Sequence, residues 1–135
     1  MSKKTIDTTK SLAIPKYILL FCKFLSSISE HVVTLFVAKL FTTPIKHKLP
    51  KRELNMDRNS KQQLIRIPSI NKSIMVYEYG TSTKKALLVH GWSGRGTQLF
   101  KIADALLKEG YATVSFDAPA HGKSPGNSSI MLEFI

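Results

Sequence analysis

The sequence predicts an α/β fold in which a β-hairpin precedes a β-strand, an α-helix and a second, parallel β-strand. Two short apolar runs, residues 86–89 and 112–116, have the length and composition of strands buried on both faces. Between them, residues 97–109 repeat apolar side chains at the spacing of an amphipathic helix, and Gly110 follows as a C-terminal stop. A strand, a helix and a strand in this order form a βαβ unit, which implies a parallel sheet.

The hairpin is expected immediately before this unit. Residues 64–67 and 74–79 are rich in β-branched and aromatic side chains, as strands are. Residues 69–72 between them suit a hairpin turn.

A long N-terminal amphipathic helix is expected over residues 15–41, and Pro44 ends it. Its polar side chains fall on one stripe at helical spacing, and the rest of its surface is apolar. The stripe consists of Lys16, Lys23, Ser27, Glu30 and Thr34. Such a wide apolar face must be covered, either by the rest of the protein or by a membrane interface, and both placements are open at this stage.

The domain boundary is expected at the end of a basic, proline-containing connector that runs from Ile45 to about Lys61. Residues 1–61 would then be a helical extension with its linker, and residues 62–135 a partial α/β domain.

Composition narrows the range of partners. The 135 residues carry a formal net charge of +11, from 20 Lys and Arg against 9 Asp and Glu. No aromatic side chain lies within the basic run 46–72, so we expect a solvated linker there and no nucleic-acid partner. Cys22 is the single cysteine, which excludes an internal disulfide and favours a reducing compartment. Lys23 or Glu30 interrupts every apolar window of about 20 residues, so we expect a cytoplasmic protein, with peripheral membrane contact through residues 15–41 left open.

The loop "HGWSGRG", residues 90–96, follows the first strand of the βαβ unit, where α/β proteins bind ligands. A phosphate-binding loop would need Lys and Ser or Thr where Thr97 and Gln98 stand. A dinucleotide fingerprint would need glycine where Leu99 stands. We therefore expect neither a nucleotide cofactor nor a metal.

Two other chemistries remain for this loop. Ser93 could be a nucleophile, but Arg95 fills the position where a nucleophile elbow needs its second glycine, so Ser93 is expected to make loop hydrogen bonds instead. An oxyanion loop fits better. Gly91 would allow a sharp turn, and the backbone N–H of Trp92 could then stabilise a developing oxyanion.

The stretch "ALLVHGWSGRGTQLFKIADALLKEGYATVSFDAPAHGKSPG", residues 86–126, resembles the front half of α/β-hydrolase-fold proteins. The family pattern is a buried strand, His-Gly-x, a helix, a second strand, and then Asp-x-x-x-His-Gly-x-Ser, which residues 117–124 match. The resemblance implies that Trp92 is the oxyanion donor and that the residues around it shape the site. Those residues are His90, Gly91, Ser93, Asp117, His121 and Gly122.

By the same resemblance, the nucleophile, the acid and the catalytic histidine should follow a helix that begins near Ser129, and they are not in the sequence. We therefore expect a truncated chain, inactive alone, from a serine-type hydrolase of small ester or acyl substrates (an esterase, lipase or peptidase-like enzyme). The alternative is a non-catalytic relative that binds a small apolar ligand or a partner.

The string Gly122–Gly126 also spells G-x-S-x-G, but two observations argue against Ser124 as a nucleophile. The residue after an elbow serine donates its backbone N–H to the oxyanion, and Pro125 has no N–H. An elbow serine also sits at the end of a strand, whereas the preceding strand is expected to end near Phe116.

Overall fold

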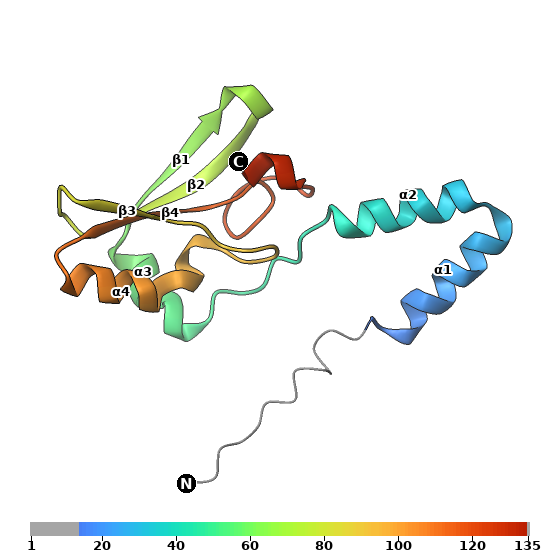
Figure 1. Cartoon of the computed structure of the whole chain (residues 1–135), viewed down its shortest axis with the longest axis horizontal. Helices are drawn as coiled ribbons and strands as arrows, with labels where there is room; N and C mark the ends of the chain where they lie inside the picture. The colour runs from blue at the N-terminus through green and yellow to red at the C-terminus, as the bar shows by residue number, and fades with distance from the viewer. Residues whose placement is uncertain (1–13, 135) are drawn as a thin grey trace, which may run out of the picture. The chain divides into compact units, whose positions relative to one another are not determined.

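The computed structural model describes residues 14–134, which fall into two compact units, one ending at Phe41 and the other beginning at Thr42. Figure 1 shows the elements of both units in the order of the chain. The strands are β1 (Lys61–Ile67), β2 (Lys72–Tyr79), β3 (Lys85–Leu88) and β4 (Ala112–Asp117). The α-helices are α1 (Lys16–Ile28), α2 (Glu30–Phe41), α3 (Leu54–Asn59) and α4 (Phe100–Lys108). Short 3-10 helices are η2 (Lys51–Glu53), η3 (Pro68–Ile70), η4 (Gly96–Leu99) and η5 (Met131–Phe134).

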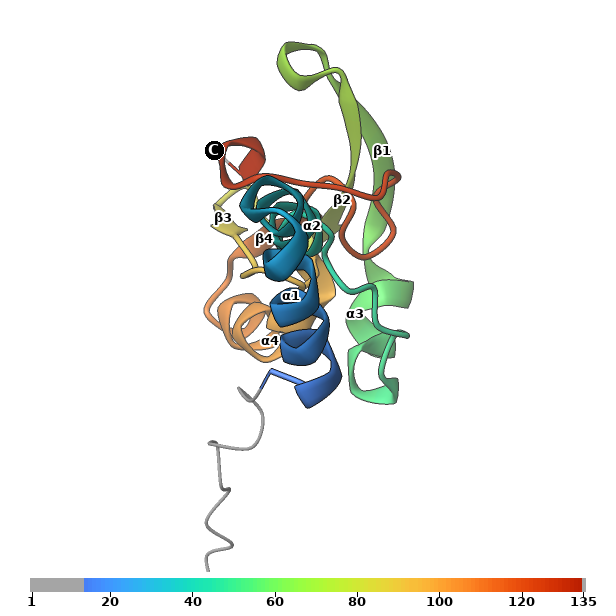
Figure 2. The ribbon, with the colours of Figure 1, turned by 90° about the vertical axis from the view of Figure 1, so that its right-hand side faces the viewer.

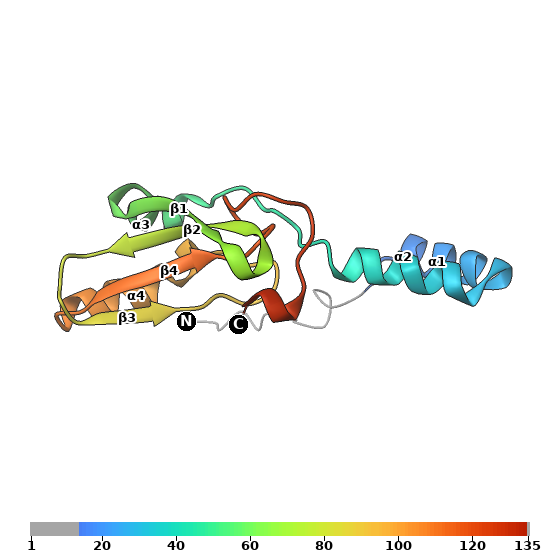
Figure 3. The ribbon, with the colours of Figure 1, turned by 90° about the horizontal axis from the view of Figure 1, so that it is seen from above.

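The second unit is built on a four-stranded sheet with the order β1-β2-β4-β3 (Figure 3). Strands β1 and β2 are antiparallel neighbours joined through η3, and the tip of this pair projects away from α3 and α4 (Figure 2). Strand β2 pairs antiparallel with β4, and β3 pairs parallel with β4. The expected α/β class and the parallel βαβ unit are therefore confirmed.

The core lies between the sheet and the helices α3 and α4, which cover one of its faces (Figure 1). Met56 of α3, Tyr79 of β2 and Ala103 of α4 are buried together there. Leu88, Phe100 and Leu107 pack against them. Alternate residues of β3 and β4 point toward this core, as the two-residue period of a strand requires.

The other face of β3 is not covered, which corrects the expectation of a strand buried on both faces. Leu87 is 64% exposed, whereas Leu88 next to it packs on the core. Strand β3 is the last strand of the sheet, and the face that carries Leu88 packs against the core cluster. The apolar composition of residues 86–89 gave no indication of this asymmetry.

The connector of residues 45–61 is also corrected, because it is part of the α/β unit rather than a solvated linker. Its second half forms η2 and α3, and both Glu53 and Met56 are about 1% exposed. The unit boundary lies between Phe41 and Thr42 instead of at residue 61.

The helix expected over residues 15–41 is two helices. Ser29 separates them with an extended backbone (φ −164°, ψ 128°), and its N–H still donates to Leu25 O. Serine competes for backbone hydrogen bonds and so favours helix ends over helix interiors. The helix expected from about Ser129 is only the short η5. None of the helices in the described range 14–134 is long and apolar enough to cross a membrane.

Candidate active site

The carboxylate of Asp117, at the end of β4, connects three parts of the α/β unit. Its Oδ1 accepts the backbone N–H of Gly96 at 2.7 Å. Its Oδ2 accepts the hydroxyl of Tyr77 and the backbone N–H of Lys123, each at 2.7 Å. Asp117 has no exposed surface, and burial together with this carboxylate raises the pKa of Tyr77 above its ordinary range. The side chain therefore fixes the loop after β3 against the loop after β4.

Two glycines make this close packing possible. A Cβ on Gly96 would stand 3.0 Å from both Ser115 Oγ and Tyr77 Cδ2. Gly122 has a positive φ of 43°, and a Cβ there would overlap the Asp117 carboxylate. Gly122 therefore needs glycine, and at Gly96 a side chain would press on β2 and β4.

The hydroxyl of Ser124 both donates and accepts a hydrogen bond in the turn after β4. It donates to Asp117 O at 2.6 Å and accepts the backbone N–H of Met75 at 2.8 Å. Ser124 is 1% exposed, and Pro125 follows it. In this arrangement Ser124 joins β2 to the turn and is not positioned for attack on a substrate.

His90 joins the two loops a second time, through its ring. Its Nε2 accepts the backbone N–H of Ala118 at 3.0 Å, so the ring proton lies on Nδ1, which donates to Gly91 O at 2.7 Å. Burial lowers the pKa of His90. The neutral ring is the form that satisfies both hydrogen bonds, because a proton on Nε2 would oppose the N–H of Ala118.

His121 lies against His90, with 5.2 Å between the ring centroids. The ring of Trp92 meets His121 edge-on at 5.1 Å, and so does that of Phe134. The Nδ1 of His121 donates to Pro119 O at 2.9 Å, while its buried Nε2 has no hydrogen-bond partner among the described residues. Burial lowers the pKa of His121, and the neighbouring His90 lowers it further.

The turn of residues 90–96 differs in detail from the expectation. The left-handed residue is Ser93 (φ 54°) rather than Gly91, and the turn is closed by Gly94 N–H donating to Gly91 O at 2.9 Å. Ser93 Oγ accepts the backbone N–H of Ile45 at 3.2 Å, which holds the serine in place. The space beside Gly91 is open, since a Cβ there would meet nothing within 4 Å. Trp92 is 43% exposed.

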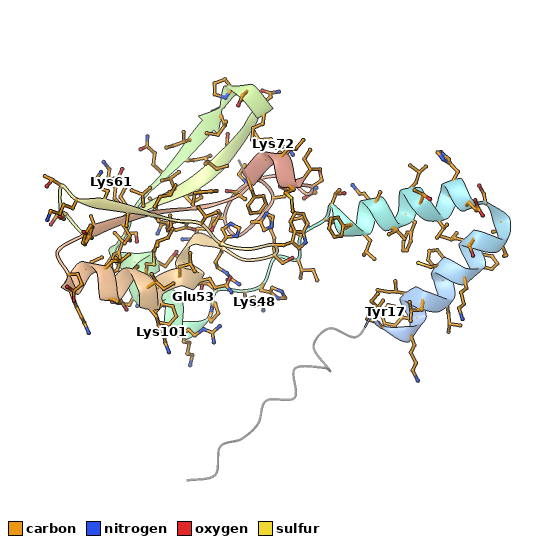
Figure 4. The ribbon with its side chains drawn as sticks, viewed as in Figure 1. Tyr17, Lys48, Glu53, Lys61, Lys72 and Lys101 are labelled. Atoms are coloured by element: carbon orange, nitrogen blue, oxygen red, sulfur yellow. The ribbon has the colours of Figure 1, made fainter. Side chains whose placement is uncertain are left out.

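A buried cluster beneath the loop was not expected from the sequence. Glu53 Oε2 accepts the hydroxyl of Thr97 at 2.9 Å and lies 3.7 Å from Arg95 Nε. Arg95 also donates to Lys48 O at 3.0 Å. Figure 4 shows Glu53 and Lys48 on the side of the sheet that α3 and α4 cover. One feature of the sequence could have indicated this cluster: Glu53 and Asp57 are the only acidic residues of the basic run 46–72.

The described residues include no group of three or more His, Cys, Asp and Glu side chains that could hold a metal ion. Two backbone loops lie at the carboxyl ends of β3 and β4, and the side chains of Asp117 and His90 fix them to each other. The structure places His90 to Ser93 on one loop and Asp117 to Gly122 on the other, and the side chains of His90 and Trp92 contact the second loop.

Solved structures of the Pyrococcus furiosus esterase Pf2001 are similar to this chain. The one in space group P212121 is 24% identical, with a TM-score of 0.51, and the match covers 63% of this chain and 33% of the esterase. This similarity shows a hydrolase-like fold. The structures in space groups C2221 and P21 match at 25% and 24% identity, with TM-scores of 0.47 and 0.49. They cover 63% and 65% of this chain, and 34% and 35% of the esterase.

The hydrolase-like fold accounts for the position of the two loops, since ligands of open α/β sheets bind at the carboxyl ends of the strands. The chain spans about a third of the length of the esterase that it matches. No protein-family model matches the chain, and neither does any curated protein.

Proposed function

We propose that this chain carries the oxyanion loop of an α/β-hydrolase-fold enzyme that acts on esters or related acyl bonds. The observation that carries the proposal is the double connection between the loops after β3 and β4. The Asp117–Gly96 and His90–Ala118 hydrogen bonds fix the backbone of both loops at the carboxyl ends of adjacent parallel strands. Backbone N–H groups held rigidly in this way are suited to stabilise charge that develops in a transition state.

Trp92 is the residue that we assign to the oxyanion hole, through its backbone N–H. It follows Gly91 at the exit of β3, on the turn that Ser93 anchors. The surroundings of Gly91 are open, so a substrate carbonyl could approach the backbone here without meeting a side chain. In this proposal His90, Asp117, His121 and Gly122 position the loops and do not react.

The nucleophile, the acid and the base are proposed to lie outside residues 14–134. Ser124 is buried, and its hydroxyl donates one hydrogen bond and accepts another. Ser93 Oγ accepts the backbone N–H of Ile45. Within residues 14–134, neither His90 nor His121 hydrogen-bonds a serine. We therefore expect no ester turnover by residues 1–135 alone.

The experiment compares two substitutions of Trp92 in a protein that joins this chain to the residues encoded after Ile135. Trp92→Pro removes the backbone N–H, whereas Trp92→Phe keeps both the N–H and an aromatic ring. With a p-nitrophenyl ester, we expect Trp92→Pro to lower kcat by roughly 100-fold or more and Trp92→Phe to change it only slightly. Equal loss in both variants would contradict the backbone role.

The sequence that follows Ile135 also decides between an enzyme and a non-catalytic relative. A G-x-S-x-G motif after a short apolar run, followed by a spaced Asp and His, would support the enzyme. A continuation of the fold without a nucleophile would refute the proposal and leave a binding protein for a small apolar ligand.

A further inference from the structure

Helix α1 presents a continuous row of large apolar side chains to solvent. Tyr17, Leu20, Phe24 and Ile28 follow one another at spacings of three and four, so they lie on one face of the helix. Each is between 60% and 72% exposed. Figure 4 shows Tyr17 at the start of this row. Neither α1 nor α2 has a buried residue, so this face is not part of a protein core in the structure.

A different face of α1 packs against α2. Phe21 and Phe36 meet edge-on with 5.0 Å between their ring centroids. Ile18, Cys22 and Leu25 are only half-buried. Helix α2 adds further exposed apolar side chains, which include Leu35 at 57% and Phe41 at 73%. The two helices thus form a pair whose outer surface stays largely apolar.

Lysines border the apolar row. Lys16 and Lys23 are seven residues apart on α1, next to Leu20 and on the side away from Phe21. Lys39 lies on α2, and Glu30 is the single acidic residue in these two helices. An apolar face bordered along one side by lysines is found in helices that lie in the plane of a membrane interface, with their apolar side chains at the headgroup boundary.

We propose that α1 and α2 bind the surface of an anionic lipid bilayer, with the row from Tyr17 to Ile28 inserted among the acyl chains and Lys16 and Lys23 at the phosphates. The competing occupant is the α/β unit of the same chain. Residues 42–135 carry fourteen Lys and Arg against seven Asp and Glu, so this unit is also positively charged. An anionic surface attracts both units, so charge complementarity favours a lipid bilayer as the occupant.

The test is flotation of the full 135-residue chain with vesicles of phosphatidylcholine containing about 30% phosphatidylserine, and with vesicles of phosphatidylcholine alone. We expect the protein to float with the anionic vesicles and mostly to stay behind with the neutral ones. Phe24→Glu should lower the floated fraction by about 10-fold, because it places a charge in the inserted row. Ser26→Glu adds the same charge on the same helix outside the row and should lower it less than about 2-fold.

Circular dichroism of each variant is the control, and it should show the same helix content as the wild type. The proposal is overturned if the wild-type chain stays in the soluble fraction with anionic vesicles, if both vesicle types float it equally, or if Phe24→Glu and Ser26→Glu have equal effects. A concentration-dependent dimer together with no flotation would assign the apolar row to a second copy of the chain.

Discussion

The Asp117 carboxylate occupies the space that any side chain on Gly122 would need. The backbone of Gly122 lies directly on the carboxylate at a positive φ, and the next residue donates its N–H to the same oxygen atom that Tyr77 contacts. The turn after β4 can therefore close only around glycine.

Gly122→Ala should destabilise the α/β unit by about 3 kcal/mol. The new Cβ would displace the carboxylate and break buried charge-assisted hydrogen bonds, and alanine would be strained at φ 43°. Gly110→Ala is the control, because Gly110 also has a positive φ (79°) but open space around it, and should cost only about 1 kcal/mol. Urea denaturation measures both, and equal losses would show that strain alone explains the effect.

The buried ion pair beneath the loop predicts a large difference between two arginines. Arg95 and Arg52 both face Glu53, at 3.7 Å and 3.9 Å, but their side chains are 12% and 69% exposed. Arg95→Met would leave the Glu53 carboxylate buried without its buried cation and should cost about 3 to 5 kcal/mol.

Arg52→Met should cost less than about 1 kcal/mol, because an exposed pair contributes little. The free energy of unfolding of each variant gives the comparison. A similar, small cost for both arginines would mean that the Glu53 charge is not held by Arg95.

Acid should destabilise the α/β unit through its two neighbouring buried histidines, His90 and His121. Burial lowers the pKa of His90 and of His121, so the folded state keeps both rings neutral while the unfolded chain takes up protons near pH 6.5. The contribution of the neutral rings to the free energy of unfolding is complete above pH 6.5 and is lost as the pH falls toward the lowered folded-state pKa values. For each ring, the free energy of unfolding falls by up to about 1.4 kcal/mol per pH unit.

The measurement is the free energy of unfolding between pH 7.5 and pH 5. In the His121→Phe variant, the free energy of unfolding should decline less steeply with falling pH, because one of the two rings has been removed. The control is His31→Gln, which changes an exposed histidine of α2 and should leave the slope as it is in the wild type. A slope that His121→Phe does not change would place the acid sensitivity elsewhere.

The parallel βαβ unit and the position of the two loops could be predicted because they depend on local patterns. The apolar runs that became β3 and β4, and the amphipathic repeat that became α4, are readable from composition and spacing. The resemblance to α/β hydrolases then placed Asp117 and Gly122 on one turn. The resemblance did not indicate which groups donate hydrogen bonds to the carboxylate of Asp117.

The parts that were missed depend on contacts between residues far apart in the sequence. Helix α3 has only six residues, too few to be stable without packing, and the burial of Met56 in the core supports it. Likewise, the left-handed turn at Ser93 is held by the backbone of Ile45, 48 residues away. A local pattern cannot show such contacts, and this is why the proline-containing basic stretch by itself predicts a linker.

The most direct test of the proposed function is to find the serine that reacts with a fluorophosphonate probe. The protein to use contains this chain together with the residues encoded after Ile135, and peptide mass spectrometry locates the modified residue. We predict that the labelled serine is a residue other than Ser93 and Ser124, and that neither of these two is labelled in that protein or in the 135-residue chain. Modification of Ser124 or Ser93, with ester turnover by the 135-residue chain alone, would contradict the assignment of these residues to the loop scaffold.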